Sequence, residues 1–188
     1  MVSRHVGNNW FPMLGLSLVF LLGAAVELVG NSTYGAAPRY FVFASLAWGA
    51  GSALWLWKNP SAWPAEGRKY LYLGAAALAG VVLGAMLPFL NGCGPWLALA
   101  GSLVYYGNLE RARVIVTAGA ASAAAGLLAA MVSASVWGGL MHALAAVVCA
   151  FASSRLHLLR HGRRRARQHE DIDVLDFLQD DDEDSRAR

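Results

Sequence analysis

Charged residues are scarce in this chain. Of its 188 residues, 14% are Asp, Glu, Lys or Arg, whereas 57% are hydrophobic. A soluble domain carries about a quarter charged residues, so this apolar excess indicates a bilayer as the solvent. The formal net charge of +3 is small, and the basic residues flank apolar segments, where anionic lipid headgroups are the nearest partner. We therefore expect an integral membrane protein that binds no nucleic acid.

Sequence signatures of catalysis are missing as well. The chain contains no nucleophile elbow around a serine, no HExxH motif, no paired-carboxylate motif and no phosphate-binding glycine loop after a strand. Three histidines near the C-terminus, His157, His161 and His169, are flanked by arginines, which disfavours a metal ion. We predict a non-enzymatic protein with no cofactor and no metal site.

Six apolar stretches occupy most of the chain. A helix needs about 20 apolar residues to span the hydrocarbon core of a bilayer. We therefore predict an all-α polytopic fold with six transmembrane helices, at residues 11–30, 38–57, 70–90, 95–109, 112–132 and 135–159. The fourth is shorter than the ~30 Å hydrocarbon thickness requires. It must therefore snorkel through Arg111, thin the lipid around it or be shielded by its neighbours.

Basic residues fall in alternate gaps between these stretches. Arg4 precedes the first stretch, and the arginines of residues 155–167 follow the sixth. Between them, the gap after the second stretch holds Lys58, Arg68 and Lys69, and the gap after the fourth holds Arg111 and Arg113. The remaining gaps hold one basic residue, Arg39. Lys and Arg are retained on the cytoplasmic side during insertion. We therefore expect an inner or plasma membrane protein with cytoplasmic residues 1–10 and 160–188, so that both termini face the cytoplasm.

This topology separates the two cysteines. Cys93 falls in an outer loop, whereas Cys149 lies deep in the sixth helix. Fourteen helical residues place Cys149 roughly 20 Å from the outer end of that helix, which is too far for a disulfide. Neither cysteine has the spacing of a metal site.

Small residues mark where helices pack together. Glycines recur in all six stretches, in a pattern that suggests three helical hairpins in tandem. The densest small-residue segment is 118–130, in the fifth helix. Small residues let helix backbones approach closely in lipid. This face therefore packs within the bundle or contacts another subunit.

Two ionisable residues fall inside the membrane. Glu27 is near the outer end of the first helix, and His142 is at a similar depth in the sixth. Buried ionisable groups are costly in lipid, so they indicate function by default. Together the two side chains would form a pH-sensing pair. In the simpler alternative, Glu27 pairs with Arg39 and His142 bonds a backbone carbonyl.

The cytoplasmic tail changes from basic to acidic. We expect its basic part to contact anionic lipid headgroups through Arg160, Arg163, Arg164, Arg165 and Arg167. The acidic part embeds apolar residues that would form the edge of a short helix able to dock in a partner protein, namely Ile172, Leu175, Phe177 and Leu178. Otherwise residues 160–188 form a largely disordered, solvated tail.

The helical part of the chain resembles three kinds of bacterial membrane protein. Asn9-Trp10, GLSLVFLLGAAVEL (15–28) and GAAALAGVVLGAML (74–87) resemble the HdeD-like family of six-helix acid-resistance membrane proteins. That resemblance implies a role in membrane or acid stress and supplies no catalytic residues. WLALAGSLVYYGNLERARVIV (96–116) looks like the membrane sensor region of some histidine kinases. The length and helix number also resemble the substrate-binding subunit of a vitamin transporter.

Overall fold

The computed structural model describes residues 6–29, 36–59, 65–87, 90, 92–132 and 136–160, apart from the side chains of 36–38. Within these ranges the chain is helical and contains no strand, which confirms the expected all-α class. A short 3-10 turn, η1 (Val6–Asn9), leads into the helices, which are α1 (Trp10–Val29), α2 (Ala36–Lys58), α3 (Gly67–Ala85), α4 (Gly94–Leu109), α5 (Arg113–Met131) and the C-terminal helix (Val136–Arg160).

The third helix ends earlier than the sequence predicted, at Ala85 rather than near residue 90. Its last turn tightens, because Met86 N–H bonds the Leu83 carbonyl at 3.0 Å and Leu87 N–H bonds that of Gly84 at 3.3 Å. Leu87 precedes a proline, and the residue before a proline is sterically disfavoured in the helical conformation. The proline therefore ends the helix before the chain reaches the proline itself.

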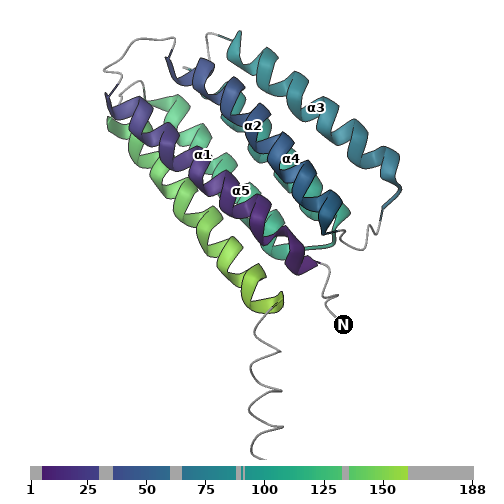
Figure 1. Ribbon diagram of the computed structural model, residues 1–188. Helices are drawn as coiled ribbons and strands as arrows, with labels where there is room; N and C mark the ends of the chain where they lie inside the picture. The colour runs from purple at the N-terminus through teal and green to yellow at the C-terminus, as the bar shows by residue number, and fades with distance from the viewer. Residues whose placement is uncertain are drawn as a thin grey trace, which may run out of the picture.

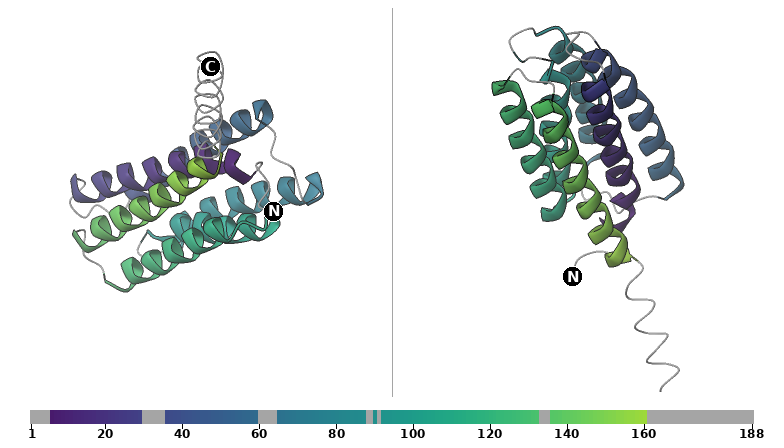
Figure 2. Two further views of the ribbon diagram at one scale, coloured as in Figure 1. Left: turned by 90° about the horizontal axis from the view of Figure 1, so that it is seen from below. Right: turned by 90° about the vertical axis from the view of Figure 1, so that its left-hand side faces the viewer.

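Consecutive helices run antiparallel, and the C-terminal helix lies beside α1 (Figures 1 and 2). Two hydrogen bonds join these two helices, one near the middle of α1 and one at its first residue. Ser17 donates to the Ala146 carbonyl at 2.8 Å, and Ser153 donates to that of Trp10 at 2.7 Å. On its other side the C-terminal helix meets α5, where the Ser122 hydroxyl lies 3.7 Å from the Cys149 sulfur. The first and last helices are thus brought together in one bundle.

Glycines set the closest helix contacts. A Cβ added at Gly84 of α3 would lie 2.5 Å from the carbonyl carbon of Gly94, at the start of α4. A Cβ at Gly119 of α5 would lie 2.8 Å from the backbone nitrogen of Val104 in α4. Such approaches are the main source of helix affinity in lipid. α4 is therefore held between α3 and α5 by backbone proximity.

Four helices are long and apolar enough to cross a bilayer, namely Val6–Val29, Arg39–Lys58, Arg113–Met131 and Val136–Arg160. α4 has 16 residues, or about 24 Å at 1.5 Å per residue. Its side chains Trp96, Leu99 and Leu103 are buried among the neighbouring helices. This burial is in keeping with shielding of the short helix by its neighbours.

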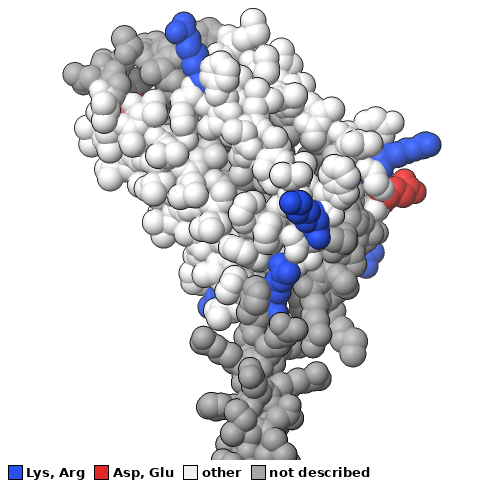
Figure 3. Space-filling view, viewed as in Figure 1, with Lys and Arg blue, Asp and Glu red and all other residues white. Residues whose placement is uncertain are grey.

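Basic side chains gather at one end of the bundle. The helix directions place every described Lys and Arg except Arg39 at the end where α1 begins, namely Lys58, Arg68, Lys69, Arg111, Arg113, Arg155 and Arg160. Figure 3 shows a broad uncharged band on one face, with Lys and Arg side chains at its upper end and along its lower right edge. We call the end that carries most of them the basic end.

Candidate ligand pocket

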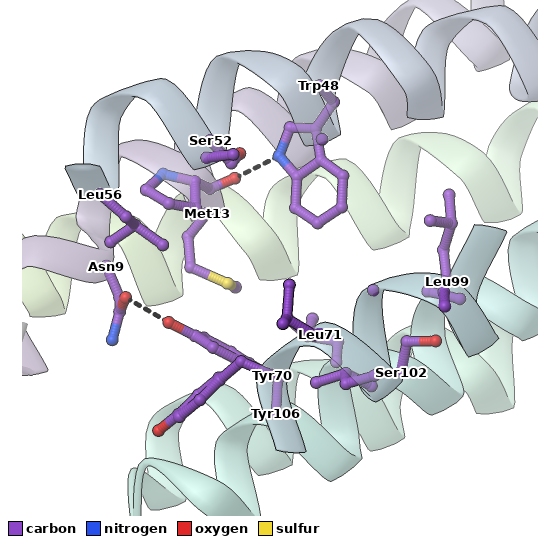
Figure 4. A pocket seen from close by; sticks show the side chains of 18 of the residues that line it. Asn9, Met13, Trp48, Ser52, Leu56, Tyr70, Leu71, Leu99, Ser102 and Tyr106 are labelled. Carbon is purple, nitrogen blue, oxygen red and sulfur yellow. Dashed lines mark hydrogen bonds between the residues drawn. The ribbon is translucent and has the colours of Figure 1, made fainter. Parts of the chain in front are cut away.

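A pocket of about 820 Å³ opens between α1, α2, α3 and α4, toward the basic end (Figure 4). This volume is typical of small-molecule sites. The walls are mainly apolar, and among the described residues that line the pocket none is charged. The chain therefore provides a neutral, ligand-sized space inside a bundle whose outer surface is apolar.

The pocket communicates with the lateral surface of the bundle between α2 and α3. Two residues that line it, Trp57 and Leu71, are 82% and 74% exposed. Gly49 and Gly74 also line it, and a Cβ added at either would meet nothing within 4 Å. Glycine leaves this opening wide, because any larger side chain at these positions would extend into the space.

Polar groups in the walls are mostly engaged with the protein itself. The Trp48 indole donates to the Pro12 carbonyl at 2.8 Å, and the Ser102 hydroxyl donates to that of Ala98 at 2.7 Å. Trp48 thus forms part of the pocket wall (Figure 4). Its hydrogen bond fixes α2 against the first turn of α1.

A hydrogen-bonded network closes the pocket at the basic end. Tyr106 donates to Asn9 Oδ1 at 2.7 Å, and Tyr70 donates to Glu110 Oε1 at 2.8 Å. Glu110, in the turn between α4 and α5, is only 3% exposed. Burial raises the pKa of its carboxyl group, because the charged form is poorly solvated there, while Tyr70 and Asn9 lower the pKa in part.

The turn that positions Glu110 has an unusual backbone. Arg111 adopts φ 52°, the left-handed region that favours glycine. Two hydrogen bonds complete a Schellman motif at the end of α4, from Ala112 N–H to the Gly107 carbonyl at 2.8 Å and from Arg111 N–H to that of Asn108 at 3.2 Å. The motif turns the chain sharply and holds Glu110 inward while the Arg111 side chain is exposed.

Glu27 and His142 both lie against Gly138 at the opposite end, but no hydrogen bond or ion pair joins the two side chains in the described part of the chain. Both contact Gly138, because an added Cβ there would lie 3.0 Å from Glu27 Oε1, and the Gly138 carbonyl is 2.8 Å from His142 Nδ1. His142 is 3% exposed, its ring centroid lies 4.2 Å from that of Trp96, and its Nε2 has no hydrogen-bond partner. The simpler alternative holds for His142, which bonds the Gly138 backbone carbonyl. It does not hold for Glu27, since the described residues contain no ion pair with Arg39, which is exposed.

Other predicted features fall into two groups. The small-residue face of the fifth helix is buried within the chain, through Ala118, Gly119, Ser122, Ala125, Gly126 and Ala129. Arg160, the first residue of the tail, is described and lies against Gly7. A Cβ added at Gly7 would be 2.8 Å from the Cβ of Arg160. The other arginines predicted to contact lipid headgroups, and the apolar residues at 172–178, lie outside the described residues.

The pocket was not predicted from the sequence. Gly49 and Gly74 were interpreted as packing positions, and Tyr70, Tyr106 and Glu110 were not singled out. The available signal was Glu110, a carboxylate that directly follows an apolar helix on the side expected to be rich in basic residues. Comparison of the chain with protein-family models, curated proteins and solved structures finds no match.

Proposed function

We propose that this protein is a six-span membrane protein, with both termini cytoplasmic, that binds a neutral, largely apolar small molecule in the pocket between α1, α2, α3 and α4. The observation that carries the proposal is the pocket itself, about 820 Å³ in volume and without a charged residue among the described residues that line it. The role is binding rather than catalysis, in keeping with the absence of catalytic motifs from the sequence.

The orientation is supported by the distribution of charge. The basic end carries all the described Lys and Arg except Arg39, and basic residues are retained on the cytoplasmic side. The pocket then lies in the cytoplasmic half of the membrane. A reporter fused after Arg188 tests this orientation. Activity of a cytoplasmic reporter supports it, whereas activity of a reporter that requires export contradicts it.

The ligand class follows from the surroundings of the pocket. Its opening between α2 and α3 faces the lateral surface, where Trp57 and Leu71 are exposed, so a ligand dissolved in the bilayer reaches it without crossing water. An ionic ligand would lose its hydration and find no opposite charge in the walls, a penalty of several kcal/mol. Neutral, lipid-soluble molecules avoid this cost.

A pair of glycines on one helix gives a matched test. A Cβ at Gly49 or at Gly51 meets nothing within 4 Å, but only Gly49 lines the pocket. The hydrocarbon probe diphenylhexatriene, added to the protein in lipid nanodiscs, accepts excitation energy from Trp48 when it is bound in the pocket. Gly49→Leu should reduce this transfer, and Gly51→Leu should leave it unchanged. Equal transfer in both variants and the wild type would contradict ligand binding at this site.

A role in acid response is a second candidate, favoured by the shared contact of Glu27 and His142 with Gly138. A change in protonation of either side chain would alter the contact between α1 and the C-terminal helix. Glu27→Gln and His142→Gln should then remove any acid dependence of cell survival conferred by the protein. Survival that remains acid-dependent in both variants would contradict this role.

A further inference from the structure

We infer that the pocket selects neutral molecules that carry a hydroxyl group, and that the phenolic oxygen of Tyr106 accepts the hydroxyl hydrogen. This inference rests on the proposed function and specifies the ligand of the same site. A hydroxyl-bearing lipid is thereby distinguished from its carbonyl, ether and carboxylate counterparts, which have the same apolar body but no neutral donor.

The first step concerns the hydrogens that the walls could offer to a ligand. The Trp48 N–H is used by the Pro12 carbonyl, and the Ser102 O–H is used by the Ala98 carbonyl. The Tyr106 O–H is used by Asn9 Oδ1 at 2.7 Å. A ligand carbonyl or ether oxygen that approaches these groups therefore finds donors that already have partners, and would have to displace a protein hydrogen bond.

The second step identifies the acceptor that is left. Tyr70 donates to Glu110 and accepts from the Ala65 backbone N–H, so its hydroxyl is engaged in both senses. Tyr106 donates to Asn9, and a phenolic oxygen that has donated its hydrogen still offers lone pairs. Figure 4 shows the Tyr106 hydroxyl beside Asn9, at the end of the pocket. A ligand hydroxyl at this end can donate to it without disturbing the network.

Two other polar groups do not reverse this preference. The Asn9 amide nitrogen has no hydrogen-bond partner, but it is buried, so a ligand in the pocket does not reach it. The Ser52 hydroxyl, on the α2 wall, can donate or accept, and so it treats an alcohol and a carbonyl alike. Discrimination is therefore concentrated at Tyr106.

The third step excludes carboxylates. Glu110 is 3% exposed and lies directly behind the Tyr70 hydroxyl. Among the described lining residues there is no Lys, Arg or His to balance the negative charge of such a ligand. Two like charges near each other in a poorly solvated site repel strongly. An anionic ligand is disfavoured by its lost hydration at every pH, and by Glu110 at any pH where that carboxyl group is ionised.

The test compares four molecules with one apolar body, namely farnesol, its methyl ether, farnesal and farnesoic acid. Each is titrated against diphenylhexatriene bound to the full-length protein in nanodiscs, after correction for its measured partition into empty nanodiscs. A single neutral hydrogen bond contributes about 0.5–1.5 kcal/mol, so farnesol should displace the probe at roughly two- to tenfold lower concentration than the ether and the aldehyde. Farnesoic acid, measured at a pH where it is ionised, should be the weakest competitor.

Two tyrosine variants separate the acceptor from the rest of the network. Tyr106→Phe removes the acceptor and should bring farnesol and its methyl ether to the same potency. Tyr70→Phe removes another hydroxyl of the pocket, one that already donates to Glu110 and accepts from the Ala65 N–H. This variant should keep the preference for farnesol. Thermal unfolding of each variant shows whether it is folded, and if Tyr106→Phe is not, the wild-type series alone decides.

The outcomes distinguish this inference from the proposed function. Equal potency of farnesol and its ether on the wild type, or stronger displacement by farnesal, overturns the selection of hydroxyl groups. If Gly49→Leu still abolishes probe binding in that case, the proposed pocket function survives. If no compound displaces the probe and Gly49→Leu has no effect, the proposed function fails and the inference fails with it.

Discussion

Replacing Gly84 by alanine should loosen the contact between α3 and α4. An added Cβ would lie 2.5 Å from the Gly94 carbonyl carbon, 2.7 Å from its oxygen and 2.9 Å from the Pro95 nitrogen. Ordinary contacts begin at 3.4 Å, so the helices must separate by about 0.9 Å (3.4 minus 2.5). All three atoms belong to the backbone and cannot rotate away. We therefore expect the upper end of the overpacking range, a cost of about 3 kcal/mol.

Gly74→Ala is the matched control for this change. Gly74 lies in the same helix, and a Cβ there meets nothing within 4 Å. Both substitutions gain up to about 1 kcal/mol of helix propensity. That gain cancels in the comparison, so the difference between the two variants isolates the clash. We expect Gly84→Ala to be net destabilising by about 2 kcal/mol and Gly74→Ala to be neutral or stabilising.

The two buried cysteines provide the assay. Cys93 is 8% exposed and Cys149 is 0% exposed, and neither forms a disulfide. A thiol-reactive fluorophore labels them only when the bundle opens on heating. At roughly 2–4 °C per kcal/mol for a chain of this size, Gly84→Ala should melt about 6–12 °C below Gly74→Ala. Equal melting temperatures would refute the close approach of α3 and α4 described above.

Two further predictions concern the turn between α4 and α5, and a third concerns the first and last helices. Arg111→Gly should stabilise the protein by about 1 kcal/mol, because a left-handed backbone costs a non-glycine residue about 1–2 kcal/mol; an unchanged melting temperature would contradict this. Since burial raises the pKa of Glu110 above 4.5, its contribution to stability is fully present below pH 4.5 and is lost as the pH rises through the raised pKa. Glu110→Gln should flatten this part of the melting-temperature profile, and a profile identical to that of the wild type would be evidence against it. Ser17→Ala removes the bond to Ala146 and should cost about 0.6 kcal/mol, as such bonds do on average in membranes, while Ser154→Ala, which removes only a local bond within its helix, should cost less.

The helical class could be predicted from the sequence because its apolar segments are long enough to span a bilayer as helices. In lipid, a backbone can satisfy all its hydrogen bonds only as a helix or in a closed barrel. Apolar segments of this length therefore indicate helices. The placement of Glu27 and His142 at one end of the bundle was also foreseeable, since each lies a few residues from the end of its helix that is opposite the basic end. Depth along a helix can be counted from the sequence. Whether α1 and the C-terminal helix were neighbours could only be assumed.

The pocket could not be predicted, because it depends on which helices separate. Gly49 and Gly119 look alike in the sequence, yet a Cβ at Gly49 meets nothing within 4 Å whereas one at Gly119 would lie 2.8 Å from the Val104 backbone nitrogen. The same residue type therefore marks an opening in one helix and a tight contact in another. The network of Tyr70 and Glu110 joins positions 40 residues apart, a separation that no local pattern encodes.

The claim that the pocket between α1, α2, α3 and α4 holds a neutral apolar molecule is tested most directly by native mass spectrometry of the protein released from nanodiscs. Gly74→Leu fills the pocket, and Gly101→Leu places the same side chain where a Cβ also meets nothing within 4 Å but outside the pocket. We predict one bound molecule, neutral and soluble in lipid, on the wild type and Gly101→Leu, and its loss from Gly74→Leu. Retention of the same molecule by Gly74→Leu, or a charged, water-soluble molecule on the wild type, would contradict the claim.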